Sequence, residues 1–417
     1  MPSLKEALDF VEDNKDDLIK LCCNLISARS ENPPGDVSEA HRVLCDFLAF
    51  HGIDPKTLEP APGRMNLYVK IGKGSPVMIL NGHIDTVPAG DESLWDFPPF
   101  CGRLIEGKIL GRGATDMKGG VAAATLALAY AKKMEKKLKG TLVFAIVPDE
   151  ETGSKYGTKW LLSKGLLKGD FCLIAEPSGS LAAGYSIVTG EKGALWLKLE
   201  ATGKAVHGSR PHLGKNAILL ALQAYRKIKR LEKEAVKIPR NASKLIKSSD
   251  EYYSAPGWPK KESEFMKWAL RHYTVNLGTI SGGTKVNMVP DKCAAEVDIR
   301  IPIGSSVDYV RMYVKQNLPK GVSAKELGGG NPSFTDIDHP LVKAIVDVGK
   351  KVLKTPPKPI AIIASSDAGK FRRAGIPAVM FGPGYEELCH VVNEYVLAED
   401  VVNAAKVYAG VITKLLM

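Results

Sequence analysis

The chain has 417 residues, and 45% of them are hydrophobic, so it can bury a large core and is longer than one ordinary domain. Its net charge is +11, but the lysines are spread along the chain rather than gathered in one tract with interleaved aromatic residues. This pattern argues against nucleic-acid binding and favours a solvated lysine surface, with the steering of anionic substrates as an alternative hypothesis.

The sequence predicts neither a membrane span nor a redox or structural zinc motif. No run approaches the roughly 18 to 20 uninterrupted apolar residues that a span needs, and the N-terminal segment is acidic and amphipathic, unlike a signal peptide. The seven cysteines are odd in number and form no C-x-x-C pair. We therefore expect a cytoplasmic protein with no membrane partner.

The first part of the chain alternates between helical periodicity and short apolar runs. Each run is rich in β-branched residues and apolar without alternation, which is typical of a strand covered on both faces. In chain order, the pattern predicts helices over 4–28 and 37–51, a strand over 77–80, a helix over 119–137, and strands over 142–147 and 171–175. Such alternation predicts an α/β fold with helices packed on a sheet.

The pattern changes after Pro177. Several segments now alternate in the manner of half-exposed antiparallel strands, with two helices between them. The predicted strands cover 194–202, 274–280, 293–301 and 322–327, and the predicted helices cover 216–232 and 306–317. This β-α-β-β-α-β order is that of a ferredoxin-like unit. The stretch 233–272 has no clear period, and we expect it to be an irregular excursion on this unit.

The α/β pattern returns after about residue 331. It predicts a helix over 341–352, strands over 360–364 and 378–381, and a helix over 399–416. The ferredoxin-like unit is therefore expected to be inserted into the α/β domain. The expected division is 1–181 and 332–417 for the α/β domain and 182–331 for the insert.

Polar side chains follow three of the predicted strands at the points where they end. Gly82-His83-Ile84-Asp85 follows the first, Asp149-Glu150-Glu151 the second and Glu176 the third. Ligands bind outside the carboxyl ends of strands in an open α/β sheet, so these groups should converge on one edge. Converging carboxylates repel one another, and a bound cation can offset that cost.

Taken singly, these signals have ordinary explanations. His83 could be a satisfied loop histidine, the pair Glu150-Glu151 an exposed turn, and Asp116, in a glycine-rich loop, a helix N-cap. Their joint occurrence around strand ends favours a site. Competing motifs fail: there is no Walker A sequence, no G-x-S-x-G and no H-E-x-x-H, and Gly382-Pro-Gly384 lacks the last glycine of a dinucleotide fingerprint.

These segments, taken in order, resemble the co-catalytic zinc hydrolases that include aminoacylase, acetylornithine deacetylase, succinyl-diaminopimelate desuccinylase and glutamate carboxypeptidase. The resemblance covers nearly the whole chain. It rests on GHIDTVP, GRGATDMKGG, PDEETG, AEP, GKAVHGSRPHLGKNA, TISGGTKVNMVPD, DIR and CHVVNE. It implies a mixed-sheet three-layer catalytic domain with an inserted ferredoxin-like α+β lid/dimerisation domain, and a homodimer formed through the insert.

The resemblance also implies a ligand set for two divalent metal ions. His83, Asp116 and Glu176 would bind one ion, and Asp116, Glu151 and His390 the other, with Asp116 as the bridge. Zinc is the expected metal, with cobalt or manganese as alternatives. Imidazole and carboxylate groups are the ligands that catalytic zinc accepts, with a position left for water. The Asp116–Met117 peptide would be cis.

Further roles follow from the same resemblance. Glu150 would be the general base and Asp85 would orient the ring of His83. His207 would be catalytic, reaching across a dimer to help stabilise the oxyanion. Arg300 would hold a substrate carboxylate, and Asn287 would add a hydrogen bond. The alternatives are a surface histidine at His207 and, at Arg300, pairing with a nearby acid.

Two weaker candidates for substrate binding are His212 and Gly384, the latter in the Gly382-Pro-Gly384 turn. The alternative is that they only shape the pocket. The expected activity is metal-dependent cleavage of the amide bond of a small, carboxylate-bearing N-acyl amino acid. A carboxypeptidase or dipeptidase would use the same machinery, and Glu at position 176 does not choose between them. A non-catalytic relative is the remaining alternative, and the complete set of expected ligands and base argues against it.

Overall fold

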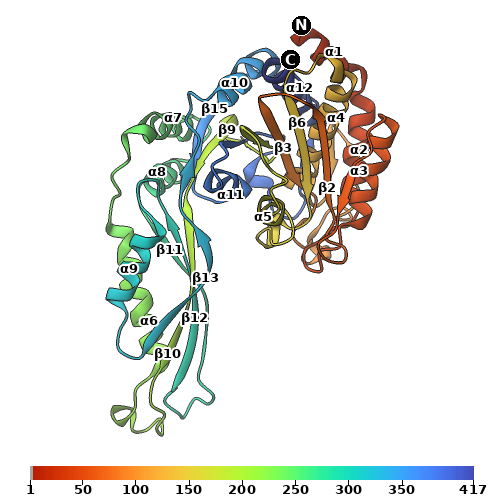
Figure 1. The fold of residues 1–417 in the computed structure, drawn as a ribbon. Helices are drawn as coiled ribbons and strands as arrows, with labels where there is room; N and C mark the ends of the chain where they lie inside the picture. Colours follow the sequence, from red (N-terminus) through yellow and green to blue (C-terminus); the bar gives the residue numbers. More distant parts are fainter. Residues whose placement is uncertain (1–2) are drawn as a thin grey trace.

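The computed structural model describes residues 3–417 and has two lobes, each built on its own sheet (Figure 1). The larger sheet is mixed and runs in the order β1-β2-β6-β3-β7-β16-β9-β14, with β15 and β8 also paired to β9. Its strands are β1 Lys56–Leu58, β2 Asn66–Gly72, β3 Val77–His83, β6 Thr141–Val147, β7 Phe171–Ile174, β8 Gly179–Ser180, β9 Gly184–Glu191, β14 Ser333–Phe334, β15 Lys358–Ile362 and β16 Ala378–Met380.

Helices cover both faces of this sheet, as an α/β sandwich requires. α1 to α4 pack together with α12 on one side, and α5 and α11 contact each other on the other side (Figure 1). α4 is buried from Gly119 to Ala131 because the sheet and other helices enclose it. The bounds are α1 Leu4–Asp13, α2 Lys15–Ser27, α3 Ser38–Phe50, α4 Gly119–Lys133, α5 Thr158–Ser163, α10 Pro340–Val352, α11 Asp367–Arg373 and α12 Ala398–Leu416.

The single helix predicted over 4–28 is wrong in one respect, because the chain forms two helices there. The first ends at Asp13, and Asn14 leaves the helical conformation with φ −113° and ψ 18°. The side-chain amide (Nδ2) of Asn14 donates to the backbone carbonyl of Phe10 at 2.7 Å. A short polar side chain that bonds its own backbone in this way favours a helix end.

The smaller sheet is antiparallel and runs β11-β12-β10-β13. In chain order it follows the predicted β-α-β-β-α-β pattern, and the inward residues of the strands form a separate core with the helices. On β10, Leu195, Leu197 and Leu199 are buried while Trp196 and Glu200 are exposed. The elements are β10 Gly193–Thr202, α6 Ala217–Ile228, β11 Thr274–Gly282, β12 Lys292–Ile301, α9 Val307–Asn317 and β13 Val322–Gly330.

The two lobes are joined by two short crossings. β9 of the large sheet ends at Glu191 and β10 of the small sheet begins at Gly193, and the return path runs from β13 to β14 through Asn331 and Pro332. The small sheet therefore lies within 193–330. β9 lies after residue 181 and still belongs to the large sheet. The division of the chain into domains at 181 and 331 remains a prediction.

The expectation of an irregular stretch at 233–272 is wrong. It contains α7 Ser243–Tyr253 and α8 Lys260–Ala269, and α7 packs on β15 of the large sheet. Leu245, Ile246 and Tyr253 are buried in the large core, and the hydroxyl of Tyr253 donates to the carbonyl of Ala361 at 3.1 Å. The helical period is masked because polar residues and tyrosines fill most positions of α7.

None of the helices in residues 3–417 combines the length and the apolar character that crossing a membrane requires.

Candidate metal centre

Strand register sets the starting geometry of the site. His83, the last residue of β3, pairs with Val147 of β6, so Asp149 to Glu151 follow directly beside it. On the other side, Asn81 pairs with Ile174 of β7, which puts Glu176 level with His83. Three segments far apart in the chain therefore leave the parallel strands at one edge, where an open α/β sheet binds its ligands.

Asp116 lies between two imidazoles. The Nε2 atom of His83 is 3.1 Å from Asp116 Oδ1 and 3.5 Å from Glu176 Oε1. The Nε2 atom of His390 is 3.2 Å from Asp116 Oδ2 and 3.3 Å from Glu151 Oε1. The five residues that the sequence singled out as ligands thus come together, and each oxygen of Asp116 faces a different histidine.

These spacings fit a metal ion. Ligand atoms about 2.0–2.2 Å from a four-coordinate zinc lie roughly 3.3–3.6 Å from one another. The spacings from His83 and His390 to their carboxylate neighbours fall at or just below that range. One atom each from His83, Asp116 and Glu151 also lie within 4.8 Å of one another. The donor chemistry and the geometry are therefore both suited to divalent cations.

The local electrostatics favour positive charge at the same place. Burial raises the pKa of Glu176 to about 7, because the ionised form loses its hydration there. Hydrogen bonds to Asp116 and Glu151 raise the pKa of His390 to about 10. Burial would also raise the pKa of Asp116, but hydrogen bonds from His390 and His83 outweigh it and lower that pKa. The carboxylates therefore stabilise cationic groups set among them.

The ring of His83 is held from behind by Asp85. The Nδ1 atom of His83 is 2.9 Å from the carbonyl oxygen of Asp85 and 3.4 Å from its carboxylate. That carboxylate also accepts hydrogen bonds from the side chain of Asn32 at 2.9 Å and from the amide of Glu150 at 3.1 Å. A partner on the second ring nitrogen fixes the tautomer and the direction of a metal-binding histidine.

Asp116 is held by a buried acid that the sequence reasoning missed. Glu394 accepts hydrogen bonds from the amides of Thr115 at 2.9 Å and Asp116 at 3.1 Å, and from Arg112 at 2.6 Å. The side chains of Arg112 and Glu394 are 3% and 1% exposed. Arg112 lies between Gly111 and Gly113 in the loop that leads to Asp116, and Glu394 follows His390 by four residues. This closeness in the chain was the available signal. The Asp116–Met117 peptide is cis, as the resemblance implies.

Glu150 lies beside the candidate ligand residues, but within residues 3–417 its carboxylate forms no hydrogen bond or ion pair with any of them. Its side chain is 17% exposed, and burial raises its pKa well above the usual value, against the effect of the nearby Lys370 ammonium group. It is next to Glu151 in the chain and follows Val147, the residue that pairs with the end of β3, by three residues. Lys370 is a second residue that the sequence reasoning did not find.

Gly384 lies next to the loop that carries Asp116. Its φ is 95°, and a Cβ atom there would approach the side chain of Thr115 to 2.9 Å, so only glycine fits. Arg300 donates to Asp298 at 3.0 Å and to the hydroxyl of Ser365 at 3.2 Å. The pairing with a nearby acid that was the alternative for Arg300 is therefore present.

The structure does not bring His207 or Asn287 to the five ligand residues. The amide of Gly208 donates to the carbonyl of Asn287 at 2.7 Å, and His207 Nδ1 lies 2.7 Å from the hydroxyl of Ser209. Both residues are exposed, as is His212 in the same loop. His207 pairs with Met288, and the loops 203–216 and 283–291 that carry these residues follow the end of β10 and precede the start of β12, at the end of the small sheet remote from the large one (Figure 1).

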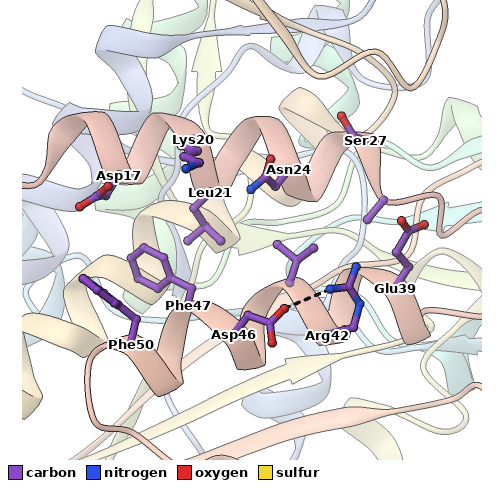
Figure 2. A pocket seen from close by; sticks show the side chains of 12 residues that line it. Asp17, Lys20, Leu21, Asn24, Ser27, Glu39, Arg42, Asp46, Phe47 and Phe50 are labelled. Atoms are coloured by element: carbon purple, nitrogen blue, oxygen red, sulfur yellow. Dashed lines mark hydrogen bonds and ion pairs between the residues drawn. The ribbon is translucent and has the colours of Figure 1, made fainter.

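A groove elsewhere in the large lobe is separate from this chemistry. It has a volume of about 500 Å³ and lies between α2 and α3, with Leu21, Phe47 and Phe50 among its lining residues (Figure 2). None of the ligand residues, Glu150 or Arg300 lines it. The candidate site is therefore placed by its ligand geometry and not by this groove.

Comparison with known proteins identifies the family to which the chain belongs, and this family fits the candidate metal-binding site. Residues 79–414 match Peptidase family M20/M25/M40. The chain belongs to this peptidase family. It is a hydrolase of amide or peptide bonds, and the metallopeptidases of the M20 family use divalent metal ions.

Individual M20 relatives cover nearly the whole chain. A "Probable succinyl-diaminopimelate desuccinylase" of Staphylococcus aureus is 30% identical over 92% of this chain and 95% of its own length. An M20 family metallo-carboxypeptidase from Sulfolobus solfataricus has a TM-score of 0.79 at 21% identity, over 95% of this chain and 98% of that one. A dinuclear metal binding M20 peptidase from Bacillus subtilis has a TM-score of 0.67 at 15% identity, over 97% and 99%. The two structures share the fold.

Proposed function

We propose that this M20 hydrolase is a dinuclear, metal-dependent amidohydrolase that cleaves the amide bond of a small N-acyl amino acid, of the acetylornithine deacetylase or succinyl-diaminopimelate desuccinylase type. One observation carries the proposal: the two oxygens of Asp116 face two separate histidines, each with a second carboxylate beside it. That arrangement supports two ions sharing one bridging ligand. The named function of the Staphylococcus aureus relative supports the substrate class.

His83, Asp116 and Glu176 would hold one divalent ion, and Asp116, Glu151 and His390 the other, with zinc as the proposed metal. The Bacillus subtilis relative is a dinuclear metal binding peptidase, which supports the proposal of two metal ions. With three ligand carboxylates and two divalent ions, the site would carry a net charge of +1. Bound ions of this kind lower the pKa of a water molecule toward about 7 and polarise a substrate carbonyl.

Glu150 is the proposed general base. It lies beside the ligands, its side chain is mostly buried, and its carboxylate is not engaged with either histidine. In this role it takes the proton of the attacking water on one carboxylate oxygen and delivers it to the leaving nitrogen. Asp85 keeps the ring of His83 in place throughout.

Arg300 is the proposed anchor for the substrate carboxylate. Its planar guanidinium group suits two-point binding of a carboxylate, and its present partners Asp298 and Ser365 hold it in place at the junction of the lobes. Gly384 would let the substrate approach the Asp116 loop closely.

We further propose that the protein is a homodimer through the inserted lobe and acts in the cytoplasm. His207 and Asn287 are exposed together at the end of that lobe, which supports their acting on the site of the partner subunit. A histidine in that position would stabilise the oxyanion that forms during amide cleavage.

The second candidate is a carboxypeptidase or dipeptidase with the same machinery, which the fold neighbour from Sulfolobus solfataricus favours. A substrate panel separates the two: N-acetyl and N-succinyl amino acids against dipeptides, with zinc, cobalt or manganese added to the metal-free protein. Preference for N-acyl amino acids is expected. Hydrolysis of dipeptides alone would select the second candidate, and activity that survives complete removal of metal would contradict both.

A further inference from the structure

Lys370 is a mostly buried cation on α11 that faces Glu150. Its side chain is 12% exposed. Its ammonium group donates to Ser154 Oγ at 2.9 Å and to Asp367 Oδ1, and it lies 3.8 Å from Glu150 Oε1. Glu150 follows β6, whereas Lys370 follows β15, so the contact joins two separate elements of the large lobe.

Counting donors shows that Lys370 has one N–H left. An ammonium group has three N–H donors, and Ser154 and Asp367 take two of them. Among residues 3–417, no hydrogen bond is made to the carboxylate of Glu150. Glu150 is thus the carboxylate that the third donor can reach when the two groups close from 3.8 Å to hydrogen-bond distance.

Asp367 does not depend on the lysine alone. Its Oδ1 accepts from the hydroxyl of Ser154 at 2.5 Å, and its Oδ2 accepts from the hydroxyl of Thr158. This buried network fixes the foot of α11 and thereby the direction of the Lys370 side chain. A side chain held in this way by its own hydrogen bonds is suited to position a neighbouring carboxylate.

We propose that Lys370 is a positioning residue for Glu150, an inference that rests on the proposed role of Glu150 as general base. The free N–H of Lys370 holds Oε1 of Glu150, so that the other carboxylate oxygen is presented to the proton of the attacking water. In this role Lys370 acts through Glu150, and its hydrogen bonds and ion pairs join it to Ser154, Asp367 and Glu150 but to none of the five candidate ligand residues. Its effect should therefore fall on the rate of the chemical step rather than on substrate binding.

The test compares Lys370→Met and Lys370→Arg with Lys414→Met, which removes a lysine from an exposed pair with Asp347. Lys370→Met should lower kcat about 10- to 100-fold and change KM by less than about threefold, since a misplaced catalytic group costs rates of this order. Lys370→Arg should recover part of the loss because it keeps the charge and the donors. Lys414→Met should behave as the wild type.

A second variant guards against misfolding. Lys370→Met leaves Asp367 as a buried unpaired charge, so Asp367→Asn with Lys370→Met is measured beside it. The same fall in kcat in this double variant, with normal metal content, supports the proposal. A kcat within twofold of the wild type in either folded variant would overturn it. A large rise in KM at unchanged kcat would also overturn it, because Lys370 would then bind the substrate.

Crystallography of the metal-loaded protein gives a readout that does not depend on turnover. In the wild type, Lys370 Nζ should lie within hydrogen-bond distance of Glu150, and in the double variant the Glu150 carboxylate should move or occupy two orientations. An unmoved carboxylate would contradict the proposal. If the wild type hydrolyses no amide substrate, the proposed function fails while this structural comparison still tests Lys370.

Discussion

Replacement of Glu394 by Gln tests whether the buried pair of Glu394 and Arg112 supports the candidate metal centre. Glu394 and Arg112 are 1% and 3% exposed and joined at 2.6 Å. Glutamine can still accept from the amides of Thr115 and Asp116, but it leaves the guanidinium group of Arg112 buried without a counter-charge. Because arginine stays protonated in proteins, Arg112 would remain a buried, unpaired charge and destabilise the fold.

The expected loss in the free energy of unfolding is about 3 kcal/mol, the lower end of the range of about 3–5 kcal/mol for breaking a buried pair. The lower end applies because Arg112 keeps its bond to the carbonyl of Val391 at 3.0 Å and its contact with the ring of Trp95. Metal affinity should fall about 10- to 100-fold, since the group that holds Asp116 is altered. Urea unfolding and competition with a chromophoric chelator measure the two effects.

Two further variants test whether the unpaired charge of Arg112 causes the loss of stability. Arg112→Leu combined with Glu394→Gln leaves no unpaired charge and should recover a substantial part of the lost stability. Asp46→Asn breaks the exposed pair with Arg42 and should cost less than about 0.5 kcal/mol. A loss below about 1 kcal/mol for Glu394→Gln, or no recovery in the double variant, would refute the account.

The remaining predictions concern the roles proposed for single residues. Glu150→Gln should lower kcat about 10²- to 10⁴-fold while elemental analysis finds unchanged metal content; full activity would remove the proposed base. Arg300→Ala should raise KM roughly 10- to 100-fold with little change in kcat, because a charge-assisted bond to the substrate is lost; an unchanged KM in steady-state kinetics would reject the anchor. His207→Ala and Glu150→Gln subunits can be mixed and reassembled. If His207 acts on the partner subunit, about half of the dimers are mixed and each has one intact site, so up to about a quarter of wild-type activity should return. No complementation would argue for a site within one chain.

The ligand positions could be predicted because a simple topological rule places them. His83, Glu151 and Glu176 follow buried strands, and parallel strands end at a common edge. The register of His83 with Val147 turns that rule into a spacing of a few ångströms. Asp116 and His390 lie in loops, where the topological rule does not apply. The glycine-rich loop made Asp116 a candidate, and only the resemblance to a known pattern of motifs pointed to His390.

The supporting residues could not be predicted in the same way. Glu394 and Lys370 are charged residues of types that are almost never fully buried, so the sequence favours an exposed position for each. Their burial results from loops that meet only after the sheet has formed: Glu394 folds under the Asp116 loop, and Lys370 reaches Glu150 from another element. Neither contact leaves a periodic signal in the chain.

One short segment connects the two ends of the proposed chemistry. Ser365 accepts from Arg300 of the inserted lobe, and five residues later Lys370 faces Glu150 of the large lobe. Between them, Ser366 is fixed by two hydrogen bonds to the buried Glu191, which ends the strand leading into the insert. The proposed substrate anchor and the proposed general base therefore share one support, which is fixed at the crossing between the lobes. A displacement of this segment would misplace both groups together, so variants that loosen it should change KM and kcat jointly, in contrast to the separate effects expected at Arg300 and Lys370.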